Sequence, residues 1–507
     1  MNATRAFARR WQTARHWQRL SGVAVLGGLA ALGHAPGGYW PLSLIALALI
    51  YGAFRQTARA RDAAILGCAA GTGYFVIALI WIVEPFLVDP VRHGWMAPFA
   101  VVLLSFYLAW YWALAFGLAK RLGGGAAAFL GAALLGETLR AVLFTGFPWA
   151  QVGHILIETP LLYWASLGGA LLLVLMMWGA AVALWHIVMG QIFLPGLVFG
   201  GMVLAYVSAP FLTPDNIAAP DAPVIRLVQP NAPQHEKWDP EKMWVFYDRQ
   251  LDFTAAAGEA RPDLVVWPET AIPFLLEDAE PALQRIASAA DRAPVVLGLR
   301  RYEGRRIYNS LISTGPDGKV EALYDKHHLV PFGEFVPFGD IMARFGIAGL
   351  AAENGQGFSA GPGPQVIDLG SLGTAAPLIC YEGVFARNLL RLPERPDMIL
   401  MITNDAWFGD VSGPYQHLAQ GRLRAVEQGL PMVRAANTGI SAIIDATGRV
   451  TASIPLGEAG FADVALPPPL RPTLYSRTGD WPIMSLALLM MSYFPLRRWL
   501  RRNEGKN

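Results

Sequence analysis

Residues 375–383 read Ala375-Ala-Pro-Leu-Ile-Cys-Tyr-Glu-Gly383, an apolar run that ends on a single cysteine. A short apolar run of this kind is typical of a buried strand. The other cysteine of the chain, Cys68, lies far away in a long apolar segment. A lone thiol at the end of a strand is either buried and inert or a nucleophile, and this stretch alone leaves both interpretations open.

Similar strands alternate with helical patterns from Pro223 to about Leu466. This alternation favours sheets that are covered by helices, and a stretch of about 245 residues can bury the core of one domain. We expect strands at residues 224–228, 264–267, 295–299, 310–313, 375–379, 398–403, 432–435 and 442–445. We expect helices near residues 241–257, 281–290 and 415–428.

The rest of the chain is strongly apolar. Of all 507 residues, 54% are hydrophobic and 15% are charged, against roughly 25% charged in a typical soluble protein. A membrane-spanning helix needs about 20 apolar residues. We therefore expect a membrane α-helical bundle of about eight spans, the first two of them short, at residues 20–33, 41–54, 63–83, 95–119, 124–144, 161–186, 194–211 and 481–496.

The positive charges predict which side of the membrane each segment faces. With the N-terminus inside, the arginines of residues 5–19 and 55–61, together with Lys120 and Arg121, all fall inside, whereas the outer loops hold only Arg92. The four arginines of residues 497–502 return to the inside. This reading gives a membrane domain at 1–220, an α/β domain at 221–470 outside the membrane, and a last span with a basic cytoplasmic tail at 471–507.

Two features of the charge distribution bear on the function of the globular stretch and on the membrane domain. Residues 221–480 hold 23 Lys and Arg against 31 Asp and Glu, so the globular stretch is acidic and a nucleic-acid binder is excluded. Glu137 and Arg140 stand three residues apart in the fifth expected span. They are expected either to pair with each other or to contact a lipid headgroup.

Two further expected loops carry charged residues next to strands. Leu264-Val-Val-Trp-Pro-Glu269 is an apolar strand that stops at a proline and leaves a carboxylate at its tip. Tyr324-Asp-Lys326 leads into a turn that presents an ammonium and, eight residues later, the carboxylate of Glu334. With Cys380 these tips supply a base, a cation that can stabilise developing negative charge, and a nucleophile.

In their order and local contexts these residues resemble the nitrilase, or carbon–nitrogen hydrolase, superfamily. The contexts are Trp-Pro-Glu269, Tyr-Asp-Lys326-x-His-Leu-Val-Pro-Phe-Gly-Glu334 and Ile-Cys380-Tyr-Glu. With seven spans before this domain and one after it, the whole chain resembles the apolipoprotein N-acyltransferase family. The resemblance implies an αββα sandwich in the periplasm of a bacterial cell, on a multi-pass domain of the inner membrane.

The resemblance also implies an activity. A phospholipid acyl chain would pass to Cys380 as a thioester, and from there to the N-terminal amine of a diacylglyceryl-cysteine lipoprotein. Glu269 would be the base and Lys326 would hold the oxyanion. The expected partners are the phospholipid donor, the apolipoprotein acceptor and the bilayer, and we expect a monomer without a cofactor.

Supporting positions follow from the same motifs. Glu334 is expected to orient or balance Lys326, while Tyr381 and Glu382 are expected to shape the pocket of the nucleophile. Four residues are weaker candidates for substrate binding: Trp238, Asn309, Trp407 and Phe408. We expect no metal, because His327 and His328 are neighbours that point in opposite directions on an extended chain, with no third ligand at zinc spacing.

Two other functions are weighed against the same sequence features. A membrane-tethered amidase or nitrilase would apply the same three residues with water as the acceptor, but seven spans are excessive for a tether. A non-catalytic scaffold or transporter would carry a degenerate domain, but Glu269, Lys326 and Cys380 are all present.

Overall fold

Two six-stranded sheets form the centre of the part of the chain that contains Cys380. The computed structural model describes residues 13–258, 260–337 and 357–504, with no side chains after residue 492. The chain divides into a helical unit, Met1–Val83, Trp95–Thr213 and Leu474–Asn507, and an α/β unit, Glu84–Gly94 and Pro214–Thr473. The divisions near residues 213 and 473 lie close to the boundaries expected from the sequence, and the short segment Glu84–Gly94 groups with the α/β unit.

The first sheet has the order β12-β1-β2-β3-β4-β5. Strand β1 is parallel to β2, β2 is parallel to β3, and the pairs β3/β4, β4/β5 and β1/β12 are antiparallel. Strand β5 therefore runs in the same direction as β2 and ends at the same edge. The bounds are β1 Val224–Gln229, β2 Leu264–Val266, β3 Val295–Glu303, β4 Arg306–Thr314, β5 Val320–Asp325 and β12 Gly460–Ala465.

The second sheet has the order β11-β10-β9-β8-β7-β6, and its three central strands β7, β8 and β9 are parallel. Strands β8 and β9 are buried along their whole length, which explains why their sequences are almost entirely apolar, with Arg434 as the charged exception in β9. The bounds are β6 Ile367–Asp368, β7 Thr374–Ile379, β8 Met398–Thr403, β9 Met432–Ala436, β10 Ser441–Ile444 and β11 Val450–Ile454.

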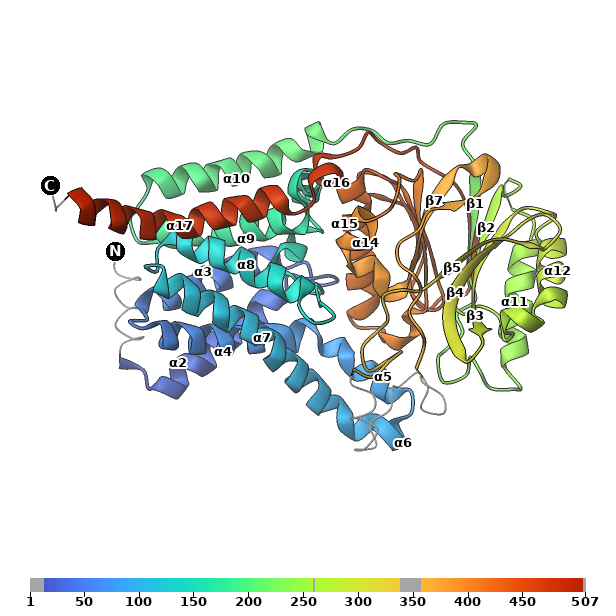
Figure 1. Ribbon diagram of the computed structural model, residues 1–507, viewed down its shortest axis with the longest axis horizontal. Helices are drawn as coiled ribbons and strands as arrows, with labels where there is room; N and C mark the ends of the chain where they lie inside the picture. Colours follow the sequence, from blue (N-terminus) through green and yellow to red (C-terminus); the bar gives the residue numbers. More distant parts are fainter. Residues whose placement is uncertain (1–12, 259, 338–356, 505–507) are drawn as a thin grey trace. The chain divides into compact units, whose positions relative to one another are not determined.

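Helices cover the outer face of each sheet. The first sheet carries α11 Met243–Ala255 and α12 Glu280–Ala289, and the second carries α14 Ala386–Leu390 and α15 Gly413–Gln428 (Figure 1). Each helix layer closes a separate apolar core with the sheet below it. The α/β unit is thus an αββα sandwich, as the sequence predicted, and the strands β5, β6, β11 and β12 were not predicted.

The helical unit has a helix within each of the eight apolar segments expected from the sequence. The bounds are α2 His16–Ala31, α3 Trp40–Gln56, α4 Ala60–Ala78, α7 Ala97–Arg121, α8 Ala126–Val142, α9 Ala165–Val188, α10 Phe193–Leu212 and α17 Trp481–Glu504. By length and composition, three stretches among the described residues can cross a membrane: Pro90–Arg121, Pro160–Val188 and Phe193–Leu212. Eight complete spans are therefore not confirmed.

The expected span at residues 63–83 needs a correction. Its helix α4 ends at Ala78, and the chain then bends by 65° into the short helices of Ile80–Leu87. This bent pair counts as a fourth candidate span if both parts cross together. The segment is apolar on both sides of the bend, so its hydropathy pattern does not indicate where the helix stops.

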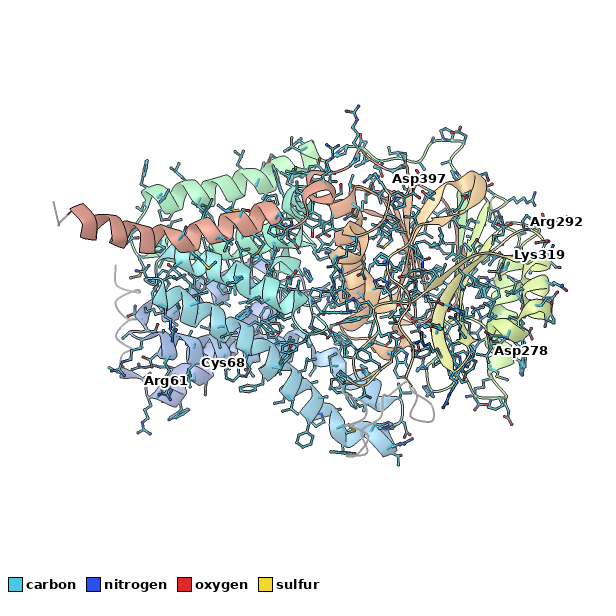
Figure 2. All side chains as sticks on the ribbon, viewed as in Figure 1. Arg61, Cys68, Asp278, Arg292, Lys319 and Asp397 are labelled. Atoms are coloured by element: carbon cyan, nitrogen blue, oxygen red, sulfur yellow. The ribbon has the colours of Figure 1, made fainter. Side chains whose placement is uncertain are left out.

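Glu137 and Arg140 on α8 are paired with each other. The carboxylate and the guanidinium are 2.5 Å apart, and their side chains are 2% and 0% exposed. Arg140 also donates to the carbonyls of Phe147 and Trp149, at 2.6 and 2.7 Å. The paired interpretation is confirmed, and burial leaves neither side chain facing a lipid headgroup. Figure 2 marks Cys68, which lies on α4 in the same unit.

Candidate functional site

Glu269 lies just beyond the carboxyl end of β2, after Trp267 and Pro268. The chain turns here against the neighbouring strand β3, and Gly298 of that strand makes the turn possible. A Cβ atom at Gly298 would lie 2.7 Å from the Cα atom of Glu269 and 2.6 Å from the backbone nitrogen of Thr270. The absence of a side chain on β3 therefore lets the carboxylate sit at this edge of the sheet.

Three groups hold the buried Glu269 carboxylate. Asn309 Nδ2 donates to Oε1 at 2.6 Å, and the backbone N–H of Asn404 donates to Oε2 at 2.8 Å. Lys326 Nζ lies 3.5 Å from Oε1. The contacts come from β4, from the loop after β8 and from the end of β5, so both sheets fix the position of one carboxylate.

Lys326 directly follows β5 and is 1% exposed. Its ammonium donates to Glu334 Oε1 at 2.8 Å, and the other oxygen of Glu334 accepts from the backbone N–H of Val330 at 2.9 Å. Burial alone would lower the pKa of Lys326, but the nearby carboxylates of Glu334 and Glu269 raise it above its usual range. The side chain is therefore a permanent cation at neutral pH.

Asn309 on β4 connects the two carboxylates. Its amide nitrogen donates to Glu269 at 2.6 Å and to Glu334 at 3.1 Å. Its amide oxygen is buried and has no hydrogen-bond partner among the described residues. An unpaired buried acceptor is costly, and it marks a place where a bound molecule could donate a hydrogen bond.

Cys380 follows β7 at the same edge and begins the short 3-10 helix Cys380–Val384. Its backbone is left-handed, with φ of 52°, which is uncommon for a residue with a side chain. Burial and the negative charge of Glu269 raise the pKa of the thiol, whereas Lys326 and a hydrogen bond to Thr403 lower it. The net effect is an increase, so the group is a neutral thiol until a base removes its proton.

Glu382 and Tyr381 hold the turn after the nucleophile. Glu382 is fully buried and accepts hydrogen bonds from the backbone N–H groups of Ile379 and His327, both at 2.8 Å. It thereby ties the turn after β7 to the loop that follows Lys326. The ring of Tyr381 packs against Phe385, with ring centres 5.0 Å apart.

The four residues expected to bind substrate lie in different places in the structure. Asn309 lies within the site, whereas Trp238 packs over the Arg300 guanidinium, 5.0 Å from it, at a pocket on the α11 side. Trp407 is partly buried in the 3-10 helix Asp405–Trp407. The ring of Phe408 is buried against His417 at 5.3 Å. In the loop that holds Trp407 and Phe408, Asn404 is the residue that contacts Glu269.

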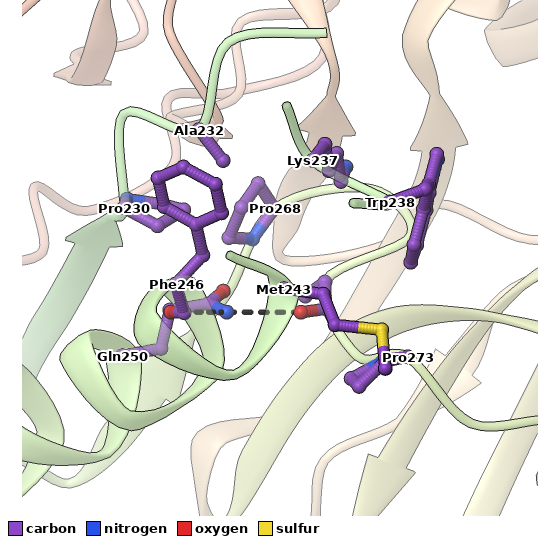
Figure 3. Close-up of a pocket in the computed structure, with 10 residues that line it drawn as sticks. Pro230, Ala232, Lys237, Trp238, Met243, Phe246, Gln250, Pro268 and Pro273 are labelled. Carbon is purple, nitrogen blue, oxygen red and sulfur yellow. Dashed lines mark hydrogen bonds between the residues drawn. The ribbon is translucent and has the colours of Figure 1, made fainter. Parts of the chain in front are cut away.

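Lys237 is a buried residue that the sequence analysis missed. Its Nζ donates to the backbone carbonyl of Glu269 at 3.1 Å and to Thr270 Oγ1 at 3.0 Å. Lys237 and Trp238 line one side of the pocket, close to Pro268 (Figure 3). Burial lowers the pKa of Lys237 to about 7, although the charge of Glu269 opposes this. A neutral amine has two N–H donors, which match these two acceptors.

Four other buried residues near Cys380 were also missed: Thr403, Asp405, His417 and Arg434. A signal was present for one of them, because Arg434 is a charged residue inside the apolar strand β9 and must have a partner there. Within the described ranges, no group of three His, Cys, Asp or Glu residues is placed to hold a metal ion.

Comparison with known proteins gives matches along most of the chain. Residues 225–471 match the family described as carbon-nitrogen hydrolase, and residues 26–183 match the family described as apolipoprotein N-acyltransferase N-terminal domain. The curated apolipoprotein N-acyltransferase of Rhodopseudomonas palustris is 37% identical over 522 residues, covering 95% of this chain and 96% of that protein. Its counterpart in Brucella melitensis is 35% identical over 510 residues, covering 94% of each.

A solved amidase from Nesterenkonia sp. is similar to the α/β unit. It is 22% identical, covers 50% of this chain and 93% of its own, and has a TM-score of 0.37.

Proposed function

The chain belongs to the apolipoprotein N-acyltransferase family, and on that basis we propose how its own residues transfer a fatty acyl chain from a membrane phospholipid to the N-terminal amine of a diacylglyceryl-cysteine lipoprotein. The observation that supports this assignment of residues is the meeting of a carboxylate, an ammonium and a thiol at one edge of the sandwich. The three residues are Glu269, Lys326 and Cys380.

The first half-reaction forms a thioester. Glu269 takes the proton of the Cys380 thiol, and the sulfur attacks the ester carbonyl of the phospholipid. The ammonium of Lys326 has three N–H donors, of which Glu334 and Glu269 engage two, so one is left for the oxyanion. The oxyanion collapses, the C–O bond breaks, and Glu269 returns the proton to the lysophospholipid that leaves.

The second half-reaction transfers the acyl chain to nitrogen. The amine of the lipoprotein attacks the thioester carbonyl, and Glu269 takes a proton from the amine. The C–S bond breaks, and Glu269 returns the proton to the sulfur, which regenerates the Cys380 thiol. The buried position of the three groups limits access of water, which favours the amine over hydrolysis. This is a ping-pong scheme with one covalent intermediate.

The membrane arrangement is part of the same proposal. The acyl donor and the acceptor lipid both reside in the bilayer, and extracting them would cost about 0.8 kcal/mol for each CH₂ group. The apolar helices of the helical unit keep the enzyme at its substrates. We place the α/β unit in the periplasm and both termini in the cytoplasm, because the arginines of residues 5–19 and 497–502 then face inward.

A hydrolase of amides or nitriles is not favoured. Its chemistry would need the α/β unit alone, whereas this chain also matches the N-terminal domain of the acyltransferase family over residues 26–183. Acyl transfer accounts for both parts of the chain.

The test is mass spectrometry of the full-length protein in detergent after exposure to phospholipid. The acyl mass is expected on Cys380, to be released by hydroxylamine, and to be absent from Cys380→Ser. Cys68→Ala is the matched control, because it removes the other thiol, on helix α4, and should keep the adduct.

Transfer is then followed by adding a diacylated peptide with a free N-terminal amine. The acyl group should leave Cys380 and appear on the peptide nitrogen. Release of free fatty acid at an equal rate with and without the peptide would instead identify a hydrolase, and an adduct that persists in Cys380→Ser would remove Cys380 from its role.

A further inference from the structure

A second buried ionic cluster lies beneath Cys380, on the second sheet. Thr403 ends β8, Asp405 follows two residues later, His417 lies on α15, and Arg434 lies on β9. All four side chains are 0% exposed. Burying ionic groups costs several kcal/mol unless each has a partner, so the contacts within such a cluster are informative.

The cluster is held together by the carboxylate of Asp405. Arg434 binds Oδ2 at 2.5 Å, while His417 Nδ1 and the hydroxyl of Thr403 approach Oδ1 at 2.9 and 2.7 Å. Burial alone would raise the pKa of Asp405, but Arg434 and His417 lower it to about 2. Asp405 is therefore a carboxylate at neutral pH and acts only as an acceptor.

Two contacts lead from this cluster to the nucleophile. His417 Nε2 lies 3.2 Å from the backbone carbonyl oxygen of Cys380. The hydroxyl of Thr403 hydrogen-bonds the side chain of Cys380, and this bond favours the thiolate. One end of the cluster thus holds the backbone of Cys380, and the other end reaches its sulfur.

The contact with the carbonyl matters because of the backbone conformation. Cys380 has φ of 52°, and a residue with a side chain keeps this strained left-handed conformation only where its surroundings hold it. His417 Nε2 faces the Cys380 carbonyl, and Nδ1 lies 2.9 Å from Asp405 Oδ1 and 3.3 Å from Arg434 Nη2. With its proton on Nε2, the imidazole donates to that carbonyl and accepts from Arg434 at Nδ1. Asp405 in turn fixes the guanidinium of Arg434.

We propose that His417, oriented by Asp405 and Arg434, is a positioning residue that holds the Cys380 turn in its reactive conformation, while Thr403 directs a hydroxyl proton to the sulfur. This inference rests on the proposed role of Cys380 as the nucleophile. The hydroxyl of Thr403 has one proton, so it donates to Asp405 while the thiol is neutral and turns to the sulfur when the thiolate forms. The charge of Asp405 raises the pKa of the Cys380 thiol, and the hydroxyl of Thr403 opposes this effect.

The experiment measures the reactivity of Cys380 without using acyl transfer. The full-length protein in detergent is labelled with iodoacetamide between pH 6 and 10, and mass spectrometry follows the label on Cys380. In a second assay, the rate of acyl-adduct formation from phospholipid is measured for the same proteins. The variants are His417→Ala, His417→Gln, Thr403→Val and Thr403→Ser. Gln420→Leu is the matched control, since Gln420 is a buried polar residue one turn along α15.

His417→Ala should slow both labelling and adduct formation by about 100-fold, because a misplacement of about 1 Å at a reacting atom costs that much. His417→Gln should recover part of the loss, since its amide can still donate to the carbonyl. Thr403→Val should move the pH profile of labelling upward by about one unit, because it loses one hydrogen bond to the thiolate. Thr403→Ser should restore the profile, and Gln420→Leu should leave both rates unchanged.

Several outcomes decide the proposal. Folded His417→Ala with labelling and adduct rates like those of the parent protein would overturn it, as would a Thr403→Val profile identical to that of Thr403→Ser. If His417→Ala does not fold, the proposal is tested by the rates of His417→Gln and by the difference between the pH profiles of Thr403→Val and Thr403→Ser. If labelling depends on His417 but the parent protein forms no acyl adduct, the proposed function fails while the positioning role stands.

Discussion

The two sheets of the α/β unit contribute different parts of the site. The first sheet supplies three polar side chains to the site: Glu269 after β2, Asn309 on β4 and Lys326 after β5. The second sheet supplies the sulfur of Cys380 after β7 and, behind it, the closed cluster around Asp405. The thiol of Cys380 and the carboxylate that we propose as its base therefore come from separate halves of the sandwich.

The two ionic clusters also differ in how completely they are paired. Both oxygens of Asp405 have close partners, and three side chains surround it. In the first cluster the oxygen of Asn309 has no partner among the residues described, and the ammonium of Lys326 keeps a donor to spare. We infer that the incompletely paired cluster is the one that meets the substrate, and that the completely paired one supports the nucleophile.

The largest expected effect comes from removing the base. Glu269→Gln should reduce acyl transfer by about 1000-fold, because a positioned general base contributes typically 10²–10⁴-fold. Its effect on iodoacetamide labelling of Cys380 should have the opposite sign. The charge of Glu269 raises the pKa of the thiol, so labelling at pH 8 should become faster. Slower labelling would contradict this electrostatic role.

Lys326→Met should slow both reactions. Lys326 lowers the pKa of the Cys380 thiol, so its loss raises that pKa further. Labelling at pH 8 should fall by about 10-fold or more, since one pKa unit changes the thiolate fraction by that factor. In the parent protein the labelling rate should still increase with pH beyond about 8.5, where an ordinary thiol levels off. A plateau at that pH would show that the site does not raise the pKa.

Lys237 should make the stability of the α/β unit depend on pH. The pKa of Lys237 is lowered to about 7 in the folded chain, against about 10.4 when unfolded, so the unfolded chain binds more protons between these values. Stability should therefore increase as pH rises through this window, by roughly 2–3 kcal/mol from pH 7.5 to 9.5.

Lys237→Met should remove that slope, because it removes the titrating group. The measurement is Tm of the full-length protein at the two pH values, with the difference between parent and variant as the readout. Tm values that change in parallel with pH in both proteins would contradict the assignment.

The smallest effect is expected at the turn between β4 and β5. Lys319 pairs with Asp317 at 2.7 Å, but its side chain is 83% exposed. Exposed pairs are screened by water and contribute little to stability, so Lys319→Ala should change neither acyl transfer nor Tm measurably. A loss of activity would mean that this edge of the first sheet contacts a substrate, and the comparison of the two sheets would need revision.

The sequence predicted strands β2 and β7, which lead to Glu269 and Cys380, because these are apolar runs that stop at Pro268 and Cys380. It did not predict β5, which leads to Lys326. Strands β11 and β12 escaped prediction because they are only partly buried and mix polar with apolar residues, as in Val450-Thr-Ala-Ser-Ile454. His417 escaped for another reason, since a single histidine on a helix gives no sign of what lies opposite it.

The sequence by itself determined the family, the apolar helices and the sandwich, and it singled out Glu269, Lys326 and Cys380 as candidates, since strand periodicity and short motifs are local properties. Only the tertiary structure decided which side chains lie next to them. Asn309 meets Glu269 from 40 positions away, and Asn404 meets it from 135 positions away. Such contacts follow from the order of strands in two sheets, and a linear pattern does not encode that order.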